Sequence, residues 1–220
     1  MQILLFILLV LLTNSNPAYC QTDTSDKKTS FNFDYGFKVT VGDEEGFGAF
    51  KTFISFELSR NGKLIFTDKS NIEYEFGNKL YPIVMQTGKD SYELLFEIND
   101  RPSKNYLKRL FVKEDRVIRT DKLPTFVSKP VDINGNGVKE YAGFWDHGQM
   151  WGENYSLTAY NPILYYSVTK NGLKLDSLLT KERNVFIYGK FHGYDFSEKI
   201  EVPASVSKAF DAEIKLLTKI

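Results

Sequence analysis

Two alternating segments, each with an Asn-Gly dipeptide, constrain the fold of this 220-residue chain more than any other feature. Residues Ile54–Phe66 contain Asn61-Gly62, and residues Leu164–Leu175 contain Asn171-Gly172. Alternation of apolar and polar residues is typical of a strand with one buried face. Asn-Gly favours a two-residue type I′ turn, because both central residues of that turn need a positive φ. We therefore predict two antiparallel β-hairpins.

The turn positions recur at nearly constant intervals along the chain. A two-residue turn at each dipeptide places Leu58 opposite Ile65 and Val168 opposite Leu175. Midway between the two hairpins, Asp115 occupies the turn position of a third alternating segment. The turns at 61, 115 and 171 are 54 and 56 residues apart, and such a period is typical of repeat architectures.

Further strand candidates precede the turns, and aromatic residues make up 15% of the chain, which favours strands. The candidates are Phe33–Val39, Tyr92–Glu97, Tyr141–Trp145 and Lys199–Val202. We predict an all-β fold, a small β-propeller-like array of three to four antiparallel units of about four strands each. A β-sandwich built from the same hairpins is the alternative, and chance spacing of hairpins would give the same period.

The C-terminal residues change to a helical pattern. Val206, Phe210, Ile214 and Leu217 repeat at intervals of three and four residues among good helix formers. We predict a short amphipathic helix over 205–217, packed on the sheet and covering one of its edges. A helix that binds a partner protein is the alternative.

The N-terminal residues have the pattern of a signal peptide. An apolar run at residues 3–12, too short to span a bilayer, is followed by Ala18 and Cys20, small residues that suit cleavage before Gln21. We predict a signal peptide at 1–20, a flexible leader at 21–30 and one domain at 31–220. The protein would be secreted or periplasmic, without a transmembrane segment in the mature chain. Lipid anchoring at Cys20 is the alternative.

The charge balance excludes some classes of function. The chain has 28 Lys and Arg against 28 Asp and Glu, all of them after residue 20. A nucleic-acid binder needs a basic field that this balance does not provide. Cleavage before Gln21 also removes the single cysteine, so the mature protein would have neither a disulfide nor a thiol nucleophile.

A short motif between the second and third hairpins has the pattern of a cation loop. Oxygen-bearing side chains occur at Asp132, Asn134 and Asn136, Gly137 follows, and Glu140 ends the run. Alternate side chains of such a loop point inward at a hard cation, and a glycine permits the sharp bend. We predict a structural Ca²⁺ site here. A plain Asx/Gly turn between strands is the alternative.

The residues around this motif argue against an EF-hand. Position twelve, which carries a bidentate Glu in an EF-hand, is Gly143, and the flanks at 125–127 and 141–145 resemble strands rather than helices. Val138 lies where such loops supply a backbone carbonyl. The predicted ligands are therefore Asp132, Asn134, Asn136, Val138 and Glu140.

The nine residues 132–140 resemble the calcium loops of FG-GAP and VCBS-type repeat proteins, in which D-x-N-x-D-G-x-x-D precedes a β-propeller strand. Asp132, Asn134, Gly137 and Glu140 match that pattern, whereas Asn136 replaces a carboxylate. The resemblance covers this loop and its flanking strands, and it implies a calcium-binding, β-propeller-like repeat protein that is secreted. Two carboxylates instead of three attract the cation less strongly.

A glycine-containing loop after the motif brings together side chains that suit ligand contacts. The candidates are Trp145, Asp146, His147, Trp151, Glu153 and Tyr155. Inward packing of Trp145 beside solvated charged neighbours is the other interpretation. The chain has no nucleophile-elbow, phosphate-loop or dinucleotide motif, and its two histidines lack zinc-site spacing.

These observations predict a secreted or periplasmic, non-enzymatic binding module with one structural calcium loop. A protein or a glycan is the expected partner. A hydrolase that uses Asp146, His147 and Glu153 is one alternative, and an envelope structural protein is the other.

Overall fold

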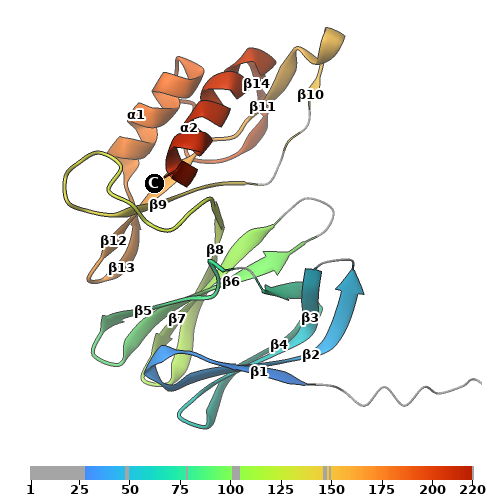
Figure 1. Cartoon of the computed structure of the whole chain (residues 1–220), viewed down its shortest axis with the longest axis vertical. Helices are drawn as coiled ribbons and strands as arrows, with labels where there is room; N and C mark the ends of the chain where they lie inside the picture. Colours follow the sequence, from blue (N-terminus) through green and yellow to red (C-terminus); the bar gives the residue numbers. More distant parts are fainter. Residues whose placement is uncertain are drawn as a thin grey trace, which may run out of the picture.

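The computed structural model describes residues 28–219 except 48–49, 78, 101–104, 146–147 and 149. Within these residues the strands form one sheet of eleven strands and one of three, accompanied by two α-helices (Figure 1). The long sheet contains β1 (Thr29–Asn32), β2 (Phe37–Phe47), β3 (Phe50–Arg60), β4 (Lys63–Phe76), β5 (Ile83–Gly88), β6 (Ser91–Asn99), β7 (Tyr106–Lys113), β8 (Arg116–Phe126), β9 (Glu140–Phe144), β12 (Leu164–Thr169) and β13 (Gly172–Leu175). The short sheet contains β10 (Met150–Trp151), β11 (Leu157–Tyr160) and β14 (Ser197–Pro203), and the helices are α1 (Ser177–Tyr188) and α2 (Ser207–Lys219).

Three antiparallel units of three strands follow one another in the long sheet. They are β2-β3-β4, β6-β7-β8 and β9-β12-β13, and each ends in a hairpin at one of the three predicted turn positions. The units join edge to edge, because β4 pairs with β6 and β8 pairs with β9. The antiparallel, mostly β architecture is confirmed. The propeller is not confirmed, because the sheets stay open and the units share one continuous sheet instead of forming separate blades.

The predicted turns are present, but both predicted registers are wrong. Asn61 and Gly62 form the turn between Arg60 and Lys63 with positive φ angles of 49° and 82°. A bulge between Ser59 and Leu58 then changes the register, so that Leu58 pairs with Phe66 instead of Ile65. In the third unit the turn lies one residue earlier than predicted. Thr169 pairs with Gly172, and Val168 therefore lies opposite Leu173 instead of Leu175.

Close packing explains the position of Gly172 in strand β13. This residue has a φ of +99°, and an added Cβ would lie 2.1 Å from Oε1 of Glu93. A glycine is therefore required at this position by the close packing of the β12–β13 hairpin against strand β6, and not by the turn.

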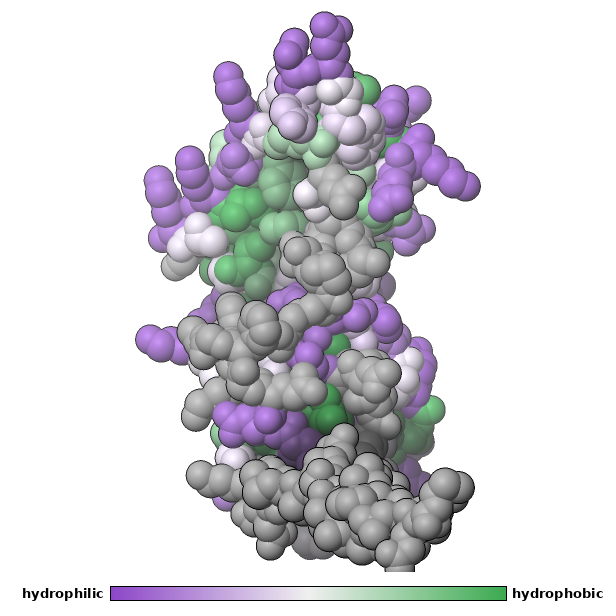
Figure 2. Space-filling view, turned by 90° about the vertical axis from the view of Figure 1, so that its right-hand side faces the viewer, coloured by the Kyte–Doolittle hydropathy of each residue, from purple (hydrophilic) through white to green (hydrophobic). Residues whose placement is uncertain are grey.

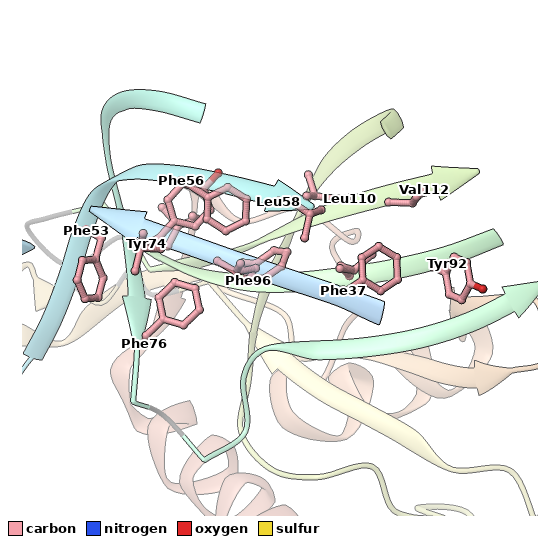
Figure 3. Packing of buried hydrophobic residues seen from close by; sticks show 14 of the residues in the cluster. Phe37, Phe53, Phe56, Leu58, Tyr74, Phe76, Tyr92, Phe96, Leu110 and Val112 are labelled. Atoms are coloured by element: carbon pink, nitrogen blue, oxygen red, sulfur yellow. The ribbon is translucent and has the colours of Figure 1, made fainter. Parts of the chain in front are cut away.

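Strand β6 is buried on both faces and separates two hydrophobic cores. Tyr92, Leu94 and Phe96 point into a first core with side chains of β2, β3, β4 and β7 (Figure 3). Aromatic rings dominate this core: Phe56 stacks on Tyr74 with centroids 4.1 Å apart and meets Phe96 edge to face. The second core lies on the opposite face, between β6–β8 and the third unit; its buried members are Tyr81, Leu95, Leu107, Leu123, Phe126, Tyr141, Leu164, Tyr166 and Leu173.

Both helices cover the remaining face of the third unit. A third core contains Ala142 and Tyr165 from the sheet with Leu179 and Ile187 of α1 and Leu217 of α2. The predicted C-terminal helix is confirmed as α2, although it packs on a sheet face rather than covering an edge. The sequence analysis missed α1.

A polar contact also fixes the two helices to the sheet. Glu213 of α2 is 5% exposed, and its Oε1 accepts hydrogen bonds from the Tyr165 hydroxyl at 2.7 Å and from Nε of Arg183 at 2.8 Å. Because Tyr165 belongs to β12 and Arg183 to α1, one carboxylate connects three elements.

The N-terminal predictions fall mostly outside the described residues. Residues 1–27, which include the predicted signal peptide and Cys20, are not described. Strand β1 begins at Thr29, so the last two residues of the predicted leader are part of the sheet. Neither described helix has the length and hydropathy that crossing a bilayer requires.

Candidate cation-binding loop

The motif at 132–140 covers the second half of the connection between strands β8 and β9 and ends on Glu140, the first residue of β9. Backbone hydrogen bonds between Val131 and Glu140 close the loop at its base, with N–O distances of 3.0 and 2.8 Å. The flanking elements are strands, as predicted, so the paired helices of an EF-hand are not present here. The loop therefore connects two interior strands of the sheet and is closed at its base.

The carboxylate of Asp132 organises the loop. Its Oδ1 accepts hydrogen bonds from the backbone N–H of Gly135 at 2.8 Å and of Asn136 at 3.1 Å. Its Oδ2 accepts one from Gly137 at 2.8 Å. Gly135 and Gly137 have φ angles of 75° and 84°, which let successive N–H groups turn toward one carboxylate. The chain thus wraps around Asp132.

The two asparagines continue this pattern. The side-chain oxygen of Asn134 accepts a hydrogen bond from the N–H of Asn136 at 3.2 Å, and that of Asn136 accepts one from Val138 at 2.8 Å. An amide oxygen has two acceptor positions, so each keeps one for a further donor or a cation. Val138 is an exposed apolar residue, so any contribution from it would come from its backbone carbonyl.

Glu140 is the unusual member of the set. The residue is 1% exposed; Oε2 accepts a hydrogen bond from the N–H of Ile133 at 3.2 Å, whereas Oε1 is buried without a hydrogen-bond partner. Burial raises the pKa of this carboxyl, the Ile133 hydrogen bond lowers it in part, and the charges of Asp132 and Asp176 raise it further. A buried, incompletely paired carboxyl group therefore lies near enough to Asp132 for the charge of this second carboxylate to raise its pKa.

The chemistry of this set suits a hard cation. Carboxylate, amide and carbonyl oxygens are the ligands that Ca²⁺ takes, at about 2.3–2.6 Å. In the described part of the chain, no cluster of three or more His, Cys, Asp and Glu side chains forms a metal site. The loop differs from such a cluster because it combines the carboxylates of Asp132 and Glu140 with amide oxygens.

The predicted ligand-contact residues that the structure describes make different contacts. Trp145 lines a pocket of about 280 Å³ between the start of α2 and strands β9–β11, where the rings of Phe144 and Phe210 lie 5.0 Å apart. Figure 2 shows apolar side chains gathered in the upper half of one face of the molecule. Trp151 instead donates from Nε1 to Oε1 of Glu201 at 3.0 Å.

The remaining candidates do not assemble a catalytic site among the described residues. Glu153 and Tyr155 lie in an exposed 3₁₀ turn, Glu153–Tyr155, and Tyr155 is 72% exposed. Asp146 and His147 lie outside the described residues.

A further cavity, lined by charged side chains, was not predicted from the sequence. It lies between the hairpin β12–β13 and strands β6–β8, and its residues are spread over positions 93 to 174. Alternation along β7 and β8 was a usable signal, because Arg109, Phe111, Arg119 and Asp121 occupy every second position of their strands and so share one face.

Comparison with known proteins gives no family assignment: no family model, curated protein or solved structure matches the chain.

Proposed function

We propose that residues 132–140 bind one Ca²⁺ and that the protein is a calcium-stabilised, non-enzymatic binding module. The observation that carries the metal proposal is the buried Oε1 of Glu140, which has no hydrogen-bond partner although Oε2 of the same carboxylate binds the loop at Ile133. Leaving a buried acceptor unsatisfied costs about 1–3 kcal/mol, and more when the group is charged. A cation would offset this cost and the repulsion between the two carboxylates.

The plain-turn alternative accounts for less of the geometry. An Asx/Gly turn explains the hydrogen bonds accepted by Asp132, Asn134 and Asn136, because each satisfies a local backbone N–H. The hydrogen bond from Ile133 to Glu140 fits such a turn as well, but the turn gives no partner to the second buried oxygen of Glu140. Ca²⁺ fits better than Mg²⁺, because it tolerates irregular sets of protein oxygens without ordered water.

The bound ion would stabilise the third unit and the helices that pack on it. Ile133, inside the loop, packs against the third core together with Val127. Fixing the loop therefore fixes a side chain that lies against the two helices. In a mature chain without cysteine, the ion would take the place of a disulfide.

The other parts of the proposal rest on sequence patterns. The apolar run before Gln21 supports export, and the resemblance of the loop to FG-GAP and VCBS repeats supports an extracellular or periplasmic role. The exposure of Tyr155 and the pocket beside Trp145 support a contact surface for a protein or a glycan.

The Glu140→Gln substitution is expected to raise the Tm in the absence of calcium and to lower it, relative to the unaltered protein, when calcium is present. Gln keeps the acceptor for Ile133 but removes the buried charge, so the variant should melt higher than the unaltered protein in a chelator. Calcium at about 100 times its Kd should stabilise the unaltered protein by about 2.7 kcal/mol, or about 5–10 °C in Tm, and the variant much less. Differential scanning calorimetry measures both effects.

Glu114→Gln, at the exposed turn of the β7–β8 hairpin, is the matched control for loss of one negative charge. It should leave the calcium response intact. A Tm of the unaltered protein that does not change with calcium would refute the metal site.

A further inference from the structure

A cavity of about 530 Å³ lies where the β12–β13 hairpin packs over strands β6, β7 and β8. Its volume falls in the range of small-molecule sites. The lining residues are Glu93, Arg109, Phe111, Arg119, Thr169, Lys170, Asn171, Gly172, Leu173 and Lys174. Four of these side chains are cationic and one is anionic, although the chain as a whole has no net formal charge.

The single acid of the lining is already neutralised. Oε2 of Glu93 lies 2.8 Å from one terminal nitrogen of Arg109 and also accepts hydrogen bonds from Arg109 Nε and from the N–H of Leu173, both at 3.1 Å. Arg109 in turn donates to the carbonyl of Leu173 at 2.9 Å. Both ionic side chains are buried, so this pair forms a fixed floor of the cavity.

Three further cations surround this floor, and only Arg119 among them has an acidic side chain of a described residue nearby. Lys170 and Lys174 are exposed, and neither forms an ion pair with a described residue. The guanidinium of Arg119 lies 3.7 Å from the centroid of the Phe111 ring, and its nearest acidic atom, Oδ2 of Asp121, is 3.6 Å away. That separation is longer than an ordinary hydrogen bond.

Stacking on Phe111 prepares Arg119 for an anion. A guanidinium stacked on an aromatic ring keeps its N–H donors in the plane of the group, and their fork matches the oxygens of phosphate, sulfate or carboxylate. The ring also limits the conformations of the side chain, so less entropy is lost on binding. Asp121 competes for this donor edge, and burial raises the pKa of its carboxyl.

We propose that this cavity binds a multiply charged oxyanion, such as a phosphate or sulfate group of a small ligand, with Arg119, Lys170 and Lys174 as its contacts. This inference names a ligand class for the binding module proposed above, and it rests on that binding role but does not require Ca²⁺. The cavity is formed by strands other than the loop at 132–140, so the two sites can be tested separately.

Titration of the whole protein with inorganic phosphate, and separately with sulfate, tests the inference. Ionic strength is held constant with sodium chloride, and binding is followed by backbone amide NMR shifts. Saturable shifts at residues 169–174 are the expected result. Arg119→Gln should weaken binding about tenfold, because it removes a charge-assisted hydrogen bond. Asp121→Asn should tighten binding several-fold, because it removes the carboxylate that competes for Arg119.

Lys215→Gln, on the exposed side of α2, is the control for an equal loss of positive charge. It should leave binding unchanged, and a loss equal to that of Arg119→Gln would overturn the site in favour of general electrostatic attraction. Shifts that grow linearly without saturation, or that lie away from 169–174, would also overturn it. Glu140→Gln should bind phosphate normally, so failure of the calcium proposal and failure of this one give different results.

Discussion

Replacing Arg109 with Met is expected to lower the free energy of unfolding by about 3–5 kcal/mol, because it leaves a charged carboxylate buried without its partner. Glu93 is 3% exposed, and the guanidinium of Arg109 supplies two of the three hydrogen-bond donors to its Oε2. Met has a similar volume and fills the space, so the loss reports on charge more than on packing. Urea denaturation measures the change.

Two further variants separate the effects of charge and packing in this pair. Glu93→Met combined with Arg109→Met should recover part of the loss, since an apolar pair carries no desolvation cost. Recovery would be incomplete, because the N–H and carbonyl of Leu173 both lose a partner. Arg119→Met, on the exposed neighbour, should cost less than about 1 kcal/mol. Equal losses for Arg109→Met and Arg119→Met would contradict the assignment.

Phe96→Ala as a single substitution is expected to lower the free energy of unfolding by about 3–5 kcal/mol, because it opens a cavity in the first core. Phe96 is 1% exposed and contacts the rings of Phe56, Tyr74 and Phe76. These side chains come from β3, β4 and β6, so their loss of contact affects the junction of the first two units. Thermal and urea unfolding both measure the loss.

Phe186→Ala is the matched control, because Phe186 lies on α1 and is 74% exposed. Removing the phenyl ring at this exposed position should change the free energy of unfolding by no more than about 0.5 kcal/mol. If Phe96→Ala were as mild as Phe186→Ala, strand β6 would not have the central, doubly buried position described above.

Local signals in the sequence predicted the local structure well. The turn at Asn61 follows from dipeptide preference, and the turn at Asp115 from its place in an alternating segment. The helix α2 follows from three-to-four-residue periodicity. Helix α1 had comparable signals, which were overlooked: the Asp176 side chain accepts a hydrogen bond from the N–H of Leu179, and Gly189 ends the helix with a φ of +72°.

Features set by tertiary packing were not predictable in the same way. The one-residue shift of the β12–β13 turn depends on the contact of Gly172 with Glu93, almost 80 residues away in sequence. The edge pairing of β4 with β6, which joins the units into one sheet, has no local signature. A repeat period therefore predicted similar units but not how they associate.

The candidate site shows the same division. The spacing of Asp132, Asn134 and Asn136 predicted a calcium loop or, as the alternative, an Asx/Gly turn. The hydrogen bonds that these side chains accept from local backbone N–H groups are compatible with both, and calcium binding stays a prediction. Glu140 is buried on the face of β9 that it shares with Ala142, and the helices pack against Ala142. This tertiary packing has no signal in the residues next to Glu140.

Isothermal titration calorimetry of Ca²⁺ into metal-free protein measures directly whether residues 132–140 bind the ion. Saturable heat with one Ca²⁺ per chain is expected, and it should be lost in Glu140→Gln and unchanged in Glu114→Gln. Heat no larger than that of dilution, or binding that Glu140→Gln leaves intact, would contradict a calcium site at 132–140.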